Sequence, residues 1–126
     1  MMKANKELRK ETELLKKKRK EAEAYLKLNK MDLDKAASDV GVNLKYDENG
    51  NIINYTEELD KLITAHQQKE AALNAKPDGP TEEELEKFDE EKAKIEDLID
   101  AIQRYDETKE SIEDIDDTIQ DNKYTE

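Results

Sequence analysis

The chain has 126 residues, of which 44% are charged and only 34% are hydrophobic, and its net charge is -12. An average globular domain has about 25% charged residues, so this composition fits either disorder or long helices that bury a narrow apolar stripe. The sequence also excludes several classes of structure: it has no cysteine for a disulfide or thiolate metal site, no apolar run of the roughly 20 residues that span a membrane, and no apolar N-terminal stretch typical of a signal peptide.

The charges are unevenly divided along the chain. Basic residues outnumber acidic ones in residues 1–30, whereas acidic residues strongly outnumber basic ones in residues 81–126. We therefore expect these two segments to lie side by side. The basic run at residues 16–20 is either a solvated helix face or a nucleic-acid patch. The net negative charge, and the absence of an aromatic residue within the run, favour the helix face.

We predict a first helix over residues 3–40, which contain no glycine or proline. Alternating steps of four and three residues from Leu8 give a mainly apolar heptad pattern, typical of a helix packed along another helix. This pattern, called the seam below, comprises Leu8, Thr12, Leu15, Arg19, Ala22, Leu26, Asn29, Leu33, Ala36 and Val40. Leu14, Tyr25, Leu28 and Met31 are expected to widen it on one side. A helix this polar needs a partner to be stable.

Residues 42–55 read as a β-hairpin that follows a helix C-cap at Gly41. Two short β-prone runs flank an Asn-Gly turn, which is a strong hairpin signal. The predicted tip consists of Tyr46, Asn49, Gly50, Ile52 and Tyr55. We expect the two tyrosines to pair across the turn.

Two more helices are predicted, over residues 56–75 and 81–122, with a loop at 76–80. Asn54 or Thr56 is expected to cap the second helix. Proline and glycine residues break the chain in the loop, and Thr81 with Glu84 forms a capping box for the third helix. The apolar positions of the third helix recur at spacings of three and four, and include Ile95, Ile102, Tyr105, Ile112 and Ile119.

These elements predict a mainly α fold: a single elongated domain over 1–126, built as a long antiparallel helical hairpin or coiled coil of three helices with a small β-hairpin at its tip. The packing seam between the first and third helices is expected to include Leu8, Leu15, Leu26, Leu33, Val40, Ile95, Ile102, Tyr105, Ile112 and Ile119. The second and third helices are either collinear or folded back into a three-helix bundle. The helix lengths favour the collinear arrangement.

The sequence contains no convincing motif for catalysis or metal binding. An EF-hand loop starting at Asp47 would have Ile52 at the position that requires glycine. A loop starting at Lys45 would have that lysine at the first ligand position, and a lysine cannot bind calcium. His66 is the only histidine and lies in an apolar stripe, so packing is the expected role. The acidic cluster of Glu110, Glu113, Asp114 and Asp117 is expected to form a solvated helix face. Carboxylate pairs act in catalysis or metal binding only within a cleft that shifts their pKa values, and a long exposed helix offers none. We expect no enzymatic activity, no cofactor and no metal.

The segment Gly41–Leu59 resembles a recurring unit of phage tail tape measure proteins. In that unit a Lys/Glu-rich helix leads into a hairpin of the form Tyr-Asp-x-x-Gly-Asn-Ile-x-Asn-Tyr, followed by further helices. The resemblance implies a domain of a longer structural protein that sets tail length, located in the virion tail and assembled in the host cytoplasm.

The alternative is a helical protein-binding adaptor or scaffold module, located in the cytoplasm. An extended apolar patch that remains exposed after the helices pair would favour this alternative. In either case the expected partners are proteins, through self-association or binding to other tail or scaffold proteins, with no small-molecule substrate and no direct nucleic-acid binding. The sequence leaves the oligomeric state open.

Overall fold

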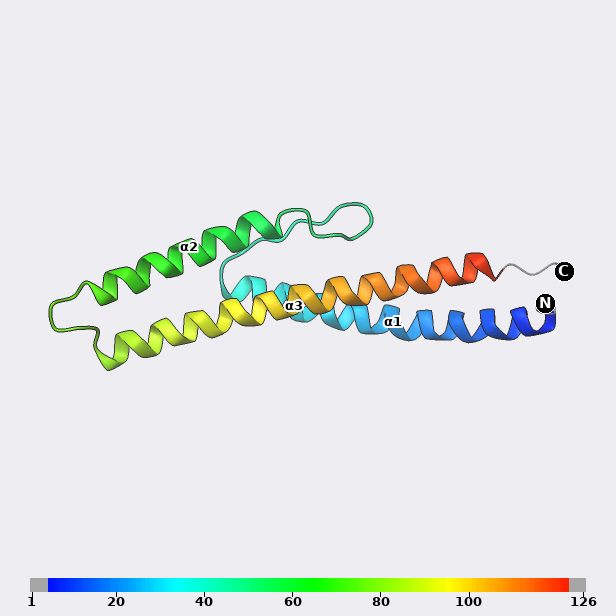
Figure 1. Cartoon of the computed structure of the whole chain (residues 1–126), viewed down its shortest axis with the longest axis horizontal. Helices are drawn as coiled ribbons and strands as arrows, with labels where there is room; N and C mark the ends of the chain where they lie inside the picture. The colour runs from blue at the N-terminus through cyan, green and yellow to red at the C-terminus, as the bar shows by residue number, and fades with distance from the viewer. Residues whose placement is uncertain (1–4, 123–126) are drawn as a thin grey trace. The chain divides into compact units, whose positions relative to one another are not determined.

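The computed structural model describes residues 5–122, and over that range the secondary structure consists of three helices. Figure 1 labels them in chain order as α1 (Asn5–Asp39), α2 (Tyr55–Asn74) and α3 (Glu82–Asp121). The chain is mainly helical, as the sequence predicts. Contacts divide it into two units. Among the described residues, unit 1 combines 5–31 with 103–122, and unit 2 comprises residues 32–102.

In unit 1, the first part of α1 and the last part of α3 lie side by side and run in opposite directions (Figure 1). The side-chain amide of Asn122 donates to the carboxylate of Glu11 at 3.2 Å. Further along α1, and correspondingly earlier in α3, the amide of Asn29 donates to the hydroxyl of Thr108 at 2.7 Å. The basic and acidic segments of the chain are therefore adjacent in this unit.

The seam is narrower than the sequence predicts. All of its positions from Leu8 to Val40 are buried or half-buried. On α3, Ile102 and Tyr105 are buried, and Ile95, Ile112 and Ile119 are half-buried. The four residues expected to widen the stripe are instead exposed: Leu14, Tyr25, Leu28 and Met31 are 62%, 54%, 58% and 68% accessible. That part of the prediction was wrong, because one helical partner covers a single heptad stripe and leaves neighbouring positions in solvent.

In unit 2, α3 folds back against α2 after the turn at residues 75–81, so the two helices are antiparallel rather than collinear (Figure 1). Lys76, just after α2, forms an ion pair with Glu84 near the start of α3. Seven residues further from the turn on each helix, Lys69 forms an ion pair with Glu91. Gly79, with a φ of 74°, allows the chain to reverse between the two prolines. The preference for collinear helices from length alone was wrong, because the reversing turn determines the arrangement.

The buried apolar residues of unit 2 come from the end of α1, the loop between α1 and α2, and α3. They are Leu33, Ala37, Val42, Ile52, Leu98, Ala101 and Ile102. None of them belongs to α2, which has no buried residue.

Two helix termini have the caps that the sequence predicts. At the end of α1, the amide of Val42 donates to the carbonyl of Ala37 at 2.8 Å, and the amide of Gly41 donates to Ser38 at 3.1 Å. With Gly41 at a φ of 72°, this is a Schellman motif, and Val42 and Ala37 are both buried beside it. At the start of α3, the amide of Glu84 donates to the hydroxyl of Thr81 at 3.2 Å. The amide of Thr81 donates back to the Glu84 carboxylate at 3.2 Å, which completes the capping box.

The predicted β-hairpin is not formed, and residues 42–54 contain a single antiparallel bridge between Tyr46 and Ile52. Tyr46 therefore lies opposite Ile52 rather than opposite Tyr55. The side chain of Asn54 occupies backbone groups that a longer ladder would use. Its side-chain oxygen accepts a hydrogen bond from the Lys45 N–H at 2.8 Å, and its side-chain nitrogen donates to the Asn43 carbonyl at 2.9 Å. This use of Asn54 also explains why it makes no side-chain cap on α2, contrary to the prediction. Thr56, the other predicted cap, lies inside α2.

Candidate functional site

The most buried polar contact of unit 1 lies in the seam. Asn29 is 5% accessible and Thr108 is 7% accessible. The Asn29 amide donates to the Thr108 hydroxyl, which itself donates to the Arg104 carbonyl at 2.8 Å. A second, longer contact joins the Asn29 amide to that same carbonyl at 3.5 Å. Because a buried polar group pairs well in only one alignment, this contact favours a single register of α1 against α3.

An ion pair lies in the same seam, closer to the start of α1. Arg19 Nε donates to the carboxylate of Asp116 at 2.5 Å, and Arg19 also pairs with Glu23 one turn along its own helix. The hydrogen bond that Arg19 donates to Asp116 is the largest cause of its raised pKa. Both side chains are more than one-third exposed, so we expect this pair to contribute modestly to stability and mainly to orient the helices.

Thr12 is a seam residue whose hydroxyl is buried. It is 4% accessible, and its Oγ1 has no hydrogen-bond partner among residues 5–122. An unpaired buried hydroxyl is unfavourable relative to water. The seam of unit 1 therefore carries polar residues that orient the pair at some expense in stability.

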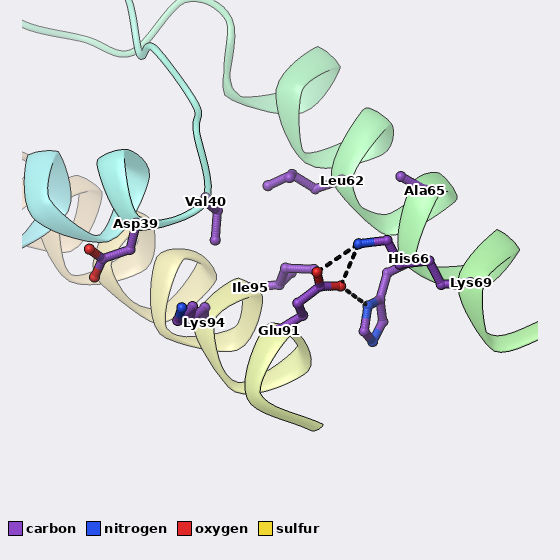
Figure 2. A pocket seen from close by; sticks show the side chains of 9 residues that line it. All are labelled: Asp39, Val40, Leu62, Ala65, His66, Lys69, Glu91, Lys94 and Ile95. Atoms are coloured by element: carbon purple, nitrogen blue, oxygen red, sulfur yellow. Dashed lines mark hydrogen bonds and ion pairs between the residues drawn. The ribbon is translucent and has the colours of Figure 1, made fainter. Parts of the chain in front are cut away.

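His66 of α2 stacks on Phe88 of α3 in unit 2, with ring centroids 4.0 Å apart and planes 13° from parallel. Its side chain is 12% accessible, and neither ring nitrogen has a hydrogen-bond partner within the described part of the chain. Nδ1 lies 3.5 Å from a carboxylate oxygen of Glu91, which is an ion-pair distance when the ring is protonated (Figure 2). The sequence predicts a packing role for His66, and the stacked ring is consistent with that role.

Glu91 is the central charged residue of this contact, and it is not among the site residues that the sequence predicts. Its carboxylate accepts two hydrogen bonds from Lys69 Nζ, at 2.6 and 2.8 Å (Figure 2). Lys69 is the main cause that lowers the pKa of Glu91, and His66 lowers it further. The sequence did contain a signal: the apolar stripe of the third helix has Phe88 and Ile95, with a gap between them that Glu91 fills.

A cavity of about 260 Å³ lies beside this contact (Figure 2). Its lining residues are Asp39, Val40, Leu62, Ala65, His66, Lys69, Glu91, Lys94 and Ile95. The lining includes both acidic and basic side chains, and the carboxylate of Glu91 already accepts hydrogen bonds from Lys69. Over residues 5–122 no group of three or more histidine or acidic side chains could hold a metal ion. The geometry therefore supports a polar contact between α2 and α3.

The residues predicted at the tip make local hydrogen bonds. The hydroxyl of Tyr46 donates to Asp34 of α1 at 2.8 Å, which ties the loop to the helix before it. The Asp47 carboxylate accepts from the amides of Asn49 and Asn51 at 2.8 and 2.9 Å. Gly50, at a φ of 79°, completes the turn. An Asx turn of this kind stabilises the loop with groups that a calcium site would need as ligands.

None of the helices within residues 5–122 is long and apolar enough to cross a membrane. The chain matches no protein-family model, no curated protein and no solved structure.

Proposed function

We propose that this chain is a non-enzymatic structural segment, and that its parent is a phage tail tape measure protein that sets tail length. The observation that carries the proposal is the antiparallel pairing of α1 and α3 in unit 1, whose register is favoured by the buried hydrogen bond between Asn29 and Thr108. A helical pair with a defined register contributes a fixed length per residue, which is what a spacer requires. The resemblance of Gly41–Leu59 to a tape measure unit supports the more specific assignment.

The test is a matched deletion in a phage whose tail protein contains this chain. Two heptads would be removed from α1 and the two facing heptads from α3, so that the seam closes in the same register. At about 1.5 Å per helical residue, the helical pair shortens by roughly 21 Å. We expect the mean tail length measured by electron microscopy to decrease by that order.

The matched control is Ala24→Asp, which changes an exposed residue of α1 and leaves the number of residues unchanged. Tails of this variant should keep the original length. Tails that keep their length after the deletion would contradict the proposed role.

A second candidate function is a helical protein-binding adaptor or scaffold module. It is supported by the exposed apolar side chains of α1, namely Leu14, Tyr25, Leu28 and Met31. Their exposure is the feature that distinguishes this candidate, because a spacer satisfied by its own pairing has no need of a second apolar face. The mass of the chain in solution distinguishes the two: a monomer favours the spacer, and specific association through α1 favours the scaffold.

A further inference from the structure

A second heptad pattern runs along α1 on a different side from the seam. It comprises Leu14, Lys18, Glu21, Tyr25 and Leu28, at alternating steps of four and three residues, and is called the outer stripe below. All five residues are exposed, and the three apolar ones are more than half accessible. A helix with two heptad stripes has the pattern of a helix that packs against two partners. In unit 1, α3 packs against the seam, and the outer stripe lies in solvent.

We propose that the outer stripe is the docking surface for a second copy of this chain, whose α1 packs against it in the antiparallel direction. The charges of the stripe argue for this occupant. Neither Lys18 nor Glu21 forms an ion pair with another residue of the range 5–122, although they are one turn apart. Each has the charge that would complement the other across an interface between two copies.

The direction follows from how heptad positions meet. In a parallel pair, equivalent positions face each other, so Lys18 would meet Lys18 and Glu21 would meet Glu21. In an antiparallel pair, the two kinds of core position alternate across the interface. Lys18 then meets the second copy's Glu21, and Leu14 meets the second copy's Tyr25. Only the antiparallel direction replaces like-charge contacts with opposite-charge contacts.

The pairing is two-fold symmetric, so every contact is made twice and the assembly closes as a dimer. Two Lys18–Glu21 pairs lie at its centre. On either side, Leu14 of one copy packs against Tyr25 of the other, with Leu28 beside them. The apolar contacts supply affinity, whereas the exposed charges mainly select direction and partner. This inference does not rest on the tail assignment, and an antiparallel dimer would favour the scaffold function.

The first test uses two charge reversals in the full chain, Lys18→Glu and Glu21→Lys, with masses measured by sedimentation equilibrium from micromolar to millimolar concentration. The unmodified chain should be a dimer at the upper end of this range. Each variant alone places like charges opposite each other, so its dissociation constant should rise at least tenfold. A 1:1 mixture of the two variants restores both opposite-charge pairs and should regain the association of the unmodified chain.

The second test determines direction with cysteines, which the natural chain lacks. A mixture of Leu14→Cys and Tyr25→Cys chains should form a disulfide-linked heterodimer under mild oxidation, because a disulfide requires Cα atoms within about 7 Å. Leu14→Cys alone should remain unlinked, since the two cysteines of an antiparallel pair are roughly 16 Å apart along the axis. Both substituted side chains are exposed, so circular dichroism should report unchanged helicity.

Three outcomes would overturn the proposal. A mass of one chain at every concentration excludes the second copy and leaves the stripe to a different partner protein. Association that each charge reversal leaves unchanged places the contact elsewhere on the chain. Ready self-linking of Leu14→Cys excludes the antiparallel direction.

Discussion

Two small polar side chains, Asn29 and Thr108, determine which alignment of α1 and α3 satisfies the buried hydrogen bonds of unit 1. The net contribution of one such bond to stability is about 1 kcal/mol, whereas an unpaired buried partner costs about 1–3 kcal/mol. Shifting one helix by a residue would separate the Asn29 amide from the Thr108 hydroxyl, which would keep only its bond to the Arg104 carbonyl of its own helix. The seam thus gains specificity from polar residues that contribute less stability than leucines would.

We predict that Thr108→Val destabilises the chain, because the valine has the same shape but cannot accept the hydrogen bond from Asn29. The remaining contact of the Asn29 amide, to the Arg104 carbonyl, is 3.5 Å long and weak. The free energy of unfolding in urea should decrease by about 1–3 kcal/mol. Thr118→Val is the matched control: Thr118 is exposed on the same helix, and its hydroxyl donates to the Asp114 carbonyl one turn earlier.

Combining Thr108→Val with Asn29→Leu should recover part of this loss, because neither side chain of this contact is then a buried polar group without a partner. A double variant that is less stable than Thr108→Val alone would show that the hydrogen bond is not the reason for the first effect.

Acidification tests the contact of Glu91 with Lys69 in unit 2. The folded-state pKa of Glu91 is lowered below its ordinary value of 4.5, chiefly by Lys69. Its contribution to stability is therefore fully present above about pH 4.5 and is lost as the pH falls through the lower folded value. In Glu91→Gln, the melting temperature should fall less than in the unmodified chain between pH 6 and pH 3. The effect is partly screened, because the side chain is 45% accessible.

Glu90→Gln is the control for this titration, because Glu90 is exposed and adjacent in sequence. Equal acid sensitivity of the Glu91→Gln and Glu90→Gln variants would show that the contact with Lys69 has no influence on stability.

At the scale of the helix, the register of the heptad decides what a substitution does. Leu26 is half-buried in the seam, whereas Ala24, two residues earlier, is exposed. A single helix of this polarity is marginal without its partner, so its stability depends on the seam more than on local preference.

We therefore predict that Leu26→Asp, which places a charge in the seam, lowers the helical signal of the chain in circular dichroism and its melting temperature. Ala24→Asp introduces the same charge on the solvent side and should change either quantity little. Full helicity retained in Leu26→Asp would mean that α1 does not depend on the packed seam.

At the scale of the whole chain, the sequence correctly predicts the features that depend on local backbone chemistry and on the spacing of apolar residues. Gly41 at the end of α1 and the capping box at Thr81 follow from backbone geometry within a few residues. The pairing of acidic and basic segments in unit 1 follows from opposite charge and matching heptads. Each of these patterns is complete within the printed sequence.

The features that could not be predicted from the sequence depend on competition between contacts that are distant in the chain. The sequence predicts Asn54 or Thr56 as the cap of α2, but the side-chain amide of Asn54 instead donates to the backbone of Asn43 on the other side of the loop. Glu91 interrupts an apolar stripe, and only the fold-back of α3 onto α2 brings Lys69 to it. Exposure of Leu28 also depends on how many partners α1 has, which heptad spacing does not state.

The lack of any buried residue in α2 has a consequence for the opening of the chain under native conditions. Subglobal unfolding costs least where few apolar contacts are lost, so α2 should open in fluctuations that leave the helix around Leu98 intact. Amide hydrogen–deuterium exchange should then be faster across Tyr55–Asn74 than across the residues around Leu98. In such an opened state Phe88 loses its stacking partner, and its ring becomes accessible to solvent.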